Sequence, residues 1–331
     1  MSQTDWARLP KAELHLHLEG AAPPAFVRGL ARQKGVDLSG AFAPDGGYAW
    51  GDFARFLRLY EAVCAVLDGP EAYRRLTLAA LEEGAASGAV YVEAFLSPDL
   101  CGGADLPAWR EHLRAIEEAA QEGERAFGVT LRGIAVCVRH WGPERARAAA
   151  LCAAEAAGGF LVGWGMAGAE TVGRPKDYAW AFDCAREAGL RITCHAGEWG
   201  GAEMVRATLD DLGPERVGHG IGAAAAPALV ERIAEAGVVL EVCPGSNVHL
   251  GAVPSLERHP IARLREGGAR VTVSTDDPPF FRTTLAREWE GLERAFGWGP
   301  QDLRELNRVA LEAAFCDRPT RERVGKALGL G

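Results

Sequence analysis

Short apolar runs alternate with amphipathic stretches along almost the whole chain. The stretches between the apolar runs, such as 108–125, 144–157, 178–188 and 226–236, are rich in Ala, Glu and Arg, as is typical of helices that cover a parallel sheet. Eight strands separated by helices predict a TIM-type (β/α)8 barrel in the α/β class. The predicted strands are 12–19, 90–97, 131–139, 160–168, 190–197, 216–221, 237–244 and 270–275.

The longest departure from this alternation is an insert of extra helices after the first strand, at about residues 21–70. Phe53, Phe56, Leu57, Tyr60 and Val63 recur there at helical spacing. Such a stripe is either ordinary core packing or an apolar lid, because the insert leaves the end of the barrel where active sites are built. No linker divides the chain, so we expect a single barrel domain over residues 1–331, closed by helices within 300–330.

Composition narrows the choice of partners. The net charge is −9 and no Lys/Arg-rich run occurs, which argues against nucleic acid and against an acidic membrane surface. A small molecule is the expected partner, and association into a homo-oligomer stays open. The start of the chain lacks the apolar core of a signal peptide, which favours a cytoplasmic protein. The eight cysteines form no CxxC pair and are expected to be free, mostly buried thiols.

The first predicted strand carries a pair of histidines. His15 and His17 alternate with Leu14, Leu16 and Leu18, so both imidazoles lie on one face of the strand. Two readings are open at this point. The pair either binds one metal ion or belongs to a half-buried strand whose histidines meet solvent.

The other metal-capable residues follow the ends of predicted strands, where barrel active sites are built. Three histidines and one carboxylate form a plausible site for one Zn²⁺, which lowers the pKa of a bound water to about 7. The same ligand types would accept iron, cobalt or manganese. No lysine ends the fourth strand, so a lysine-bridged pair of metals is not expected. The predicted ligands are His15, His17, His195 and Asp276.

Further polar residues have expected roles around such an ion. Glu198, past a glycine after His195, is placed to act as a general acid, because burial can keep a carboxyl protonated. His219 is expected to orient the attacking water, and Asp277 to face the substrate.

The remaining histidines divide into two groups. His140 and His249 are candidates for substrate contact, whereas His112 and His259 are expected to be structural or solvated. Ser246 and Asn247 are expected to brace their loop through backbone hydrogen bonds. The sequence therefore assigns no catalytic role to His112, Ser246, Asn247 or His259, which lies beside a proline.

Taken together, these residues resemble the adenosine/adenine deaminase family of the amidohydrolase superfamily. The resemblance implies a TIM-type barrel with one Zn²⁺ per chain, bound by the four predicted ligands, that hydrolytically deaminates a 6-aminopurine. It further implies that Glu198 protonates N1 of the purine, that His219 holds the attacking hydroxide, and that Asp276 is a catalytic residue as well as a ligand. The backbone amide of Gly168 would bind N3 and Asp277 would bind N7, with His17 and Glu19 also against the substrate. The matching motifs are LPKAELHLHLEG (9–20), MAGAE (166–170), HAGE (195–198), VGHG (217–220), EVCPGSN (241–247) and STDDPPFF (274–281).

Within this family the motifs point to two substrates. Members acting on adenosine usually have an aspartate at the position of Glu19, where it reaches the ribose, so Glu19 resembles the adenine deaminases. MAGAE and STDDP resemble the adenosine type instead. The expected reaction is therefore deamination of adenosine and deoxyadenosine to the inosine product and ammonia. The alternatives are adenine, another modified 6-amino nucleoside or, more remotely, the substrate of a different metal-dependent amidohydrolase.

Overall fold

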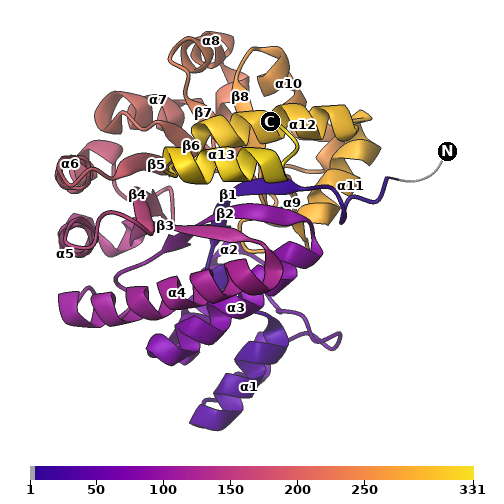
Figure 1. Cartoon of the computed structure of the whole chain (residues 1–331). Coiled ribbons are helices and arrows are strands. Elements are labelled where there is room, and N and C mark those ends of the chain that lie inside the picture. Colours follow the sequence, from indigo (N-terminus) through magenta and orange to yellow (C-terminus); the bar gives the residue numbers. More distant parts are fainter. Residues whose placement is uncertain (1–3) are drawn as a thin grey trace.

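The computed structural model describes residues 4–331 and contains one eight-stranded sheet whose strands follow one another in chain order (Figure 1). Each strand pairs in parallel with the next, which confirms the predicted TIM-type barrel. The strands are β1 (Lys11–His17), β2 (Ala89–Leu96), β3 (Thr130–Val138), β4 (Leu161–Ala167), β5 (Arg191–Ala196), β6 (Arg216–His219), β7 (Val239–Val242) and β8 (Arg270–Val273).

The barrel closes between β1 and the residues that follow β8. The backbone N–H of His17 donates to the carbonyl of Asp276 over 2.9 Å, and the N–H of Asp276 donates to the carbonyl of His15 over 3.1 Å. Closure therefore places Asp276 directly beside the histidine pair. Asp276 has φ +68 and His219 has φ +59, a left-handed conformation that non-glycine residues seldom adopt outside functional sites.

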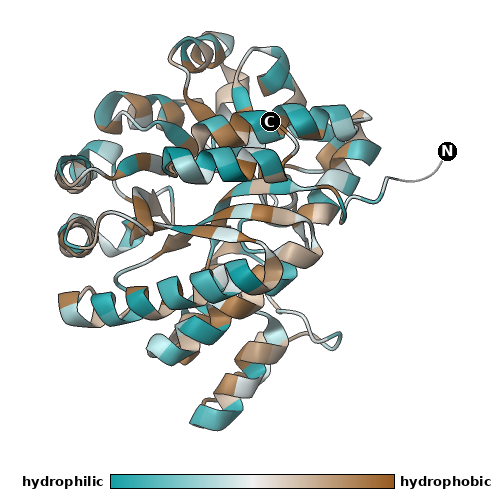
Figure 2. Cartoon of the chain, in the orientation of Figure 1, coloured by the Kyte–Doolittle hydropathy of each residue, from teal (hydrophilic) through white to brown (hydrophobic). Residues whose placement is uncertain are grey.

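Helices surround the barrel, and Figure 2 shows that they carry both hydrophilic and hydrophobic residues, as amphipathic outer helices do. Three of these helices are capped at the N-terminus by an aspartate whose side chain accepts a hydrogen bond from the backbone N–H three residues later. These aspartates are Asp52, Asp105 and Asp317. The helices are α1 (Pro24–Lys34), α2 (Phe53–Val66), α3 (Pro70–Ala86), α4 (Leu106–Phe127), α5 (Pro143–Ala154), α6 (Ala179–Glu187), α7 (Gly201–Leu212), α8 (Pro227–Glu235), α9 (Pro244–His249), α10 (Ile261–Glu266), α11 (Leu285–Phe296), α12 (Pro300–Ala313) and α13 (Arg318–Ala327).

The insert after β1 supplies α1 and α2, and it reaches the carboxyl ends of the strands. Phe56 and Val63 of α2 are buried in the hydrophobic core. Phe53, Leu57 and Tyr60 from the same helix are partly buried and line a cavity. The apolar stripe thus packs into the core on one side and lines the cavity on the other.

Two further findings concern the cysteines and the length and polarity of the helices. All eight cysteines are free, and seven of them are buried. Within residues 4–331, every helix is too short or too polar to span a bilayer.

Candidate active site

A cluster of metal-capable side chains lies where four strands end. His15, His195, His219 and Asp276 each offer a ligand atom, and these atoms all lie within 4.8 Å of one another. His17 joins them, because its Nε2 atom is 3.1 Å from His195 Nε2 and 3.2 Å from Asp276 Oδ1. Ligand atoms about 2.1 Å from a tetrahedral Zn²⁺ would lie roughly 3.4 Å from one another. The spacing therefore fits one ion, and His219 adjoins the four residues predicted as ligands.

The hydrogen bonding of His15 also suits a cation. His15 Nδ1 lies 2.9 Å from Glu241 Oε2, so this nitrogen donates its N–H to the carboxylate. Nε2 of His15 is buried and has no hydrogen-bond partner among residues 4–331, although it lies 3.4 Å from Asp276 Oδ1. An unpartnered nitrogen facing a carboxylate oxygen is the donor arrangement that a divalent metal requires.

Two neighbours complete this donor set. Burial holds the pKa of His195 well below its usual value, and the other histidines lower it further, so the ring is neutral. Burial raises the pKa of Asp276, but the neighbouring His15 and His17 rings outweigh burial and keep it well below its usual value. Ser246 Oγ donates to Asp276 Oδ2 over 2.7 Å. Oδ1 of the aspartate is thereby left to face the histidines.

Glu198 lies just past β5, on a loop that another carboxylate secures. Burial, followed by the negative charge of Asp276, raises the pKa of Glu198 to about 8, so the group holds a proton at neutral pH. The Glu170 carboxylate accepts backbone N–H bonds from Gly197, from Trp199 over 2.7 Å and from Gly200 over 3.0 Å. The sequence analysis missed Glu170, although it ends the MAGAE motif.

The loop after β7 differs from the expectation. Asn247 was expected only to brace its loop through backbone hydrogen bonds, but its side chain reaches the site. Its Nδ2 amide donates to Glu198 Oε1 over 3.0 Å and lies 3.2 Å from His219 Nδ1. Ser246 likewise uses its side chain, on Asp276. His259, expected in a surface turn, is 3% exposed and contacts Asn247. Asn247, Ser246 and His259 thus support the site. Their polar contacts depend on the tertiary structure, which no local sequence pattern encodes.

Asp277 faces the cavity with an unpartnered oxygen. Its Oδ1 atom is buried and has no hydrogen-bond partner among residues 4–331. A Cβ atom on Gly20 would lie 1.6 Å from this oxygen, so only glycine leaves room for the carboxyl. Burial and then the negative charge of Asp276 raise the pKa of Asp277 well above its usual value. A protonated Asp277 would donate a hydrogen bond to a ligand.

Glu19 is buried and bound from the side of α3. Its Oε1 atom accepts a hydrogen bond from the Tyr73 hydroxyl over 3.0 Å, and burial raises its pKa to about 7. Gly168 follows β4 with φ +97, and a Cβ atom there would lie 2.7 Å from His140 Nδ1. His140 contributes to the same cavity wall, whereas His249 packs against Trp50.

Most of the predicted site residues line a single cavity. Its opposite wall is apolar and comes from α2 together with Phe281. A planar, mostly apolar ligand with polar edges would suit these two walls. The predicted residues that line the cavity are His17, Glu19, Gly168, His195, Glu198, His219, Asp276 and Asp277.

Known proteins resemble the chain over nearly its full length. The family profile described as adenosine deaminase matches residues 10–328. A protein of Chelativorans sp. (strain BNC1) named adenine deaminase is 47% identical over 313 residues, which cover 95% of this chain and 96% of that protein.

Solved structures agree in fold. The crystal structure of an adenine deaminase from Arthrobacter aurescens has a TM-score of 0.87 at 29% identity and covers 97% of this chain and 98% of its own. A Burkholderia ambifaria amidohydrolase structure with bound Zn has a TM-score of 0.87 at 26% identity, with 99% and 93% covered.

Proposed function

The chain belongs to the adenosine deaminase family of hydrolytic deaminases, and on that basis we propose that its substrate is the free base adenine. The products would be hypoxanthine and ammonia. The expectation of adenosine is not confirmed, since the similar proteins are named adenine deaminases, which was the alternative reading. For the choice of substrate, we therefore give Glu19 more weight than the MAGAE and STDDP motifs, which resemble the adenosine type.

The observation that carries this choice is the position of Glu19. An aspartate here would reach a ribose, according to the family resemblance. Glu19 is one methylene longer, and the Tyr73 hydroxyl holds its carboxyl against α3. With one oxygen bound to Tyr73, this carboxyl has less freedom to turn toward a sugar, whereas a free base needs no group at that position.

His15, His17, His195 and Asp276 would hold one divalent metal ion, and Zn²⁺ is the ion we propose. Support comes from the unpartnered His15 Nε2 atom and from the zinc in the Burkholderia relative. Zn²⁺ would supply hydroxide at neutral pH by lowering the pKa of a water to about 7.

The protein's own groups would bind the base and move the proton. We assign the N7 contact to a protonated Asp277 and the N3 contact to the backbone amide of Gly168. Glu198, protonated at neutral pH, would donate to N1 and thereby make C6 electrophilic. Attack at C6 gives a tetrahedral carbon; the proton of the new C6 hydroxyl then passes to the amino group, and ammonia leaves as the C6=O bond forms.

His219 would direct the attack. Burial lowers its pKa to about 3, so the ring is neutral. Because the Asn247 amide donates to Nδ1, the hydrogen is on Nε2, which is left to donate to the attacking oxygen.

We also propose that residues 1–331 form one domain in which α2 acts as a lid. Phe53, Phe56, Leu57 and Tyr60 would cover the bound base and exclude water from it.

Product analysis tests the proposed reaction. Purified, zinc-loaded protein incubated with adenine should release hypoxanthine and ammonia in equal amounts, and the metal-stripped protein should release neither. Adenine recovered unchanged from the zinc-loaded protein would refute the proposal.

A further inference from the structure

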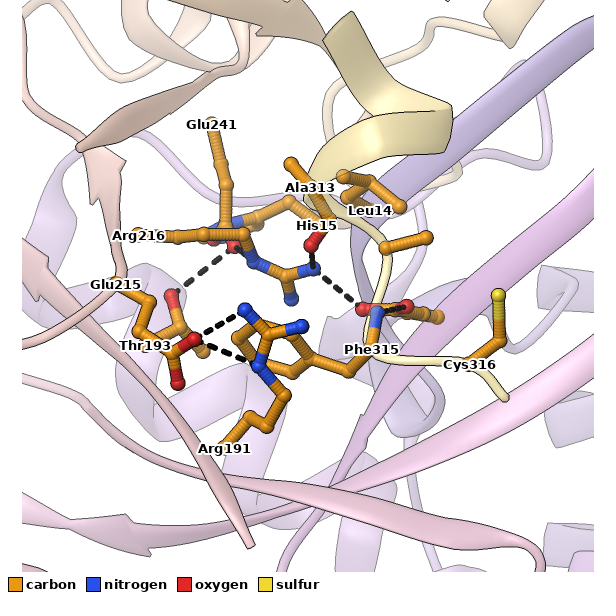
Figure 3. A network of polar contacts seen from close by, with 12 residues as sticks. Leu14, His15, Arg191, Thr193, Glu215, Arg216, Glu241, Ala313, Phe315 and Cys316 are labelled. Carbon is orange, nitrogen blue, oxygen red and sulfur yellow. Dashed lines mark hydrogen bonds and ion pairs between the residues drawn. The ribbon is translucent and has the colours of Figure 1, made fainter. Parts of the chain in front are cut away.

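A buried arginine lies beneath the proposed metal site, at the opposite end of the barrel interior. Arg216 begins β6 and is 1% exposed. Its Nη1 atom lies 2.6 Å from Glu93 Oε2, and its Nε atom lies 2.5 Å from Glu241 Oε1. The guanidinium also donates to the carbonyl of Ala313 over 3.1 Å and stacks 3.6 Å from the ring centre of Phe315 (Figure 3). One side chain thus joins two strands to the segment between α12 and α13.

Glu241 connects this arginine to the site. Its Oε1 atom faces Arg216 and accepts a hydrogen bond from Thr193 Oγ1 over 3.0 Å, while Oε2 accepts the N–H of His15 Nδ1. Both oxygens of Glu241 are therefore engaged, and the carboxylate has one orientation. Figure 3 shows Phe315, Arg216, Glu241 and His15 close together within this network.

Charge explains why the carboxylate is ionised so far from water. The Arg216 guanidinium lies directly beside the buried Glu241 carboxylate, with Nε 2.5 Å from Oε1, and so supplies the opposite charge. A carboxylate on the far nitrogen of a metal-binding histidine sets the ring's tautomer and its orientation. A fork-shaped guanidinium contacts Glu93 and Glu241 at once, which a lysine ammonium cannot do with the same geometry.

We propose that Arg216 is a positioning residue for the metal site: it holds Glu241 so that His15 keeps its hydrogen on Nδ1 and presents Nε2 to the metal. This inference rests on the proposed role of His15 as a ligand. It assigns a metal-affinity role to a residue that touches neither metal nor substrate, and it explains why the segment around Phe315 closes against the barrel interior.

The test measures the affinity of the metal-free protein for Zn²⁺ by competition with a chromophoric chelator. Arg216→Lys should weaken Zn²⁺ binding by about tenfold or more, in the range typical of residues that support metal ligands. Arg191→Lys is the matched control, because Arg191 also lies over the Phe315 ring, at 4.8 Å, but pairs with the exposed Glu215. Its affinity should stay within about twofold of wild type.

A second variant guards against loss of fold. Glu93→Gln combined with Arg216→Met removes one buried charge of each sign, which limits the destabilisation that an unpaired carboxylate causes. Its Zn²⁺ affinity should also fall about tenfold or more. Unchanged affinity in either Arg216 variant, whatever the melting temperature of the metal-free protein, would overturn the proposal. A wild type that binds no Zn²⁺ would overturn the metal site itself, and Arg216's role with it.

Discussion

The Nε2 atom of His259 lies 3.2 Å from Oδ1 of Asn247, at the far side of the site from the cavity. Because His259 Nδ1 accepts the backbone N–H of Ile261, and burial lowers the pKa of the ring to about 4, Nε2 carries the hydrogen and donates it to Asn247. This bond decides which way the Asn247 amide points. Its nitrogen is thereby directed at Glu198 and His219, the two groups with proposed proton roles.

Replacement of His259 by alanine tests that arrangement. Loss of the bond frees the Asn247 amide, and a misdirected buried hydrogen bond costs roughly 1–2 kcal/mol, so kcat should fall about tenfold while zinc content is unchanged. Asn307→Ala is the control, since this buried amide bonds to the backbone of Pro10 and Ala12 near the start of β1, away from the cavity. It should lower the melting temperature with little change in kcat. Equal kcat in the His259 variant and wild type would show that Asn247 needs no such support.

Glu198→Gln removes the acid without removing a ligand. We expect kcat to fall by about 10²–10⁴, the usual contribution of a general acid, with zinc retained. Zinc analysis and steady-state kinetics on the same sample check both statements, with exposed Glu203→Gln on α7 as the control. Loss of zinc from the Glu198 variant would mean that this carboxylate is a ligand.

Asp276→Asn should lower zinc content and activity together, because a neutral amide is a much weaker ligand for a divalent cation than a carboxylate. Stoichiometry by elemental analysis, compared with Asp183→Asn, which removes an exposed carboxylate on α6 away from the site, measures this directly. Full zinc occupancy in the Asp276 variant contradicts its assignment as a ligand.

Metal affinity should depend on pH through His15. Burial lowers its pKa, but Asp276 and Glu241 outweigh burial and raise it to about 9 in the metal-free protein. Zn²⁺ must displace that proton, so affinity should rise about tenfold per pH unit up to about pH 9 and level off above it. The raised pKa also stabilises the metal-free fold below about pH 6.5, and that contribution is lost as the pH rises through 9.

Chelator competition at several pH values, corrected for protonation of the chelator, measures this slope. An affinity that is flat between pH 6.5 and 8.5 would show that His15 is already unprotonated before the metal binds.

Much of the barrel is predictable from hydrophobic periodicity, and the predicted strands agree with the observed ones to within about two residues at most ends. The cluster around Asp276 also follows from sequence, because the carboxyl ends of parallel strands meet at one end of a barrel. The residues that support the site without lining its cavity cannot be predicted from the sequence in this way. Arg216, Glu241 and His259 are buried polar groups whose partners are distant in the chain, so no local spacing marks them.

Substrate choice is the other part that motifs alone did not decide. Glu19 differs from aspartate by one methylene, and its meaning depends on Tyr73, which lies on a helix far along the chain. The sequence offered adenosine and adenine as alternatives but weighted the motifs of the adenosine type above this residue.

The ratio of kcat/KM for adenine to that for adenosine, measured on the zinc-loaded protein, tests the central claim most directly. The account predicts that adenine is preferred by about 100-fold or more, because a site whose sugar-facing carboxyl is already bonded gives a ribose no compensating contact. A ratio near one, or a preference for adenosine, would contradict it.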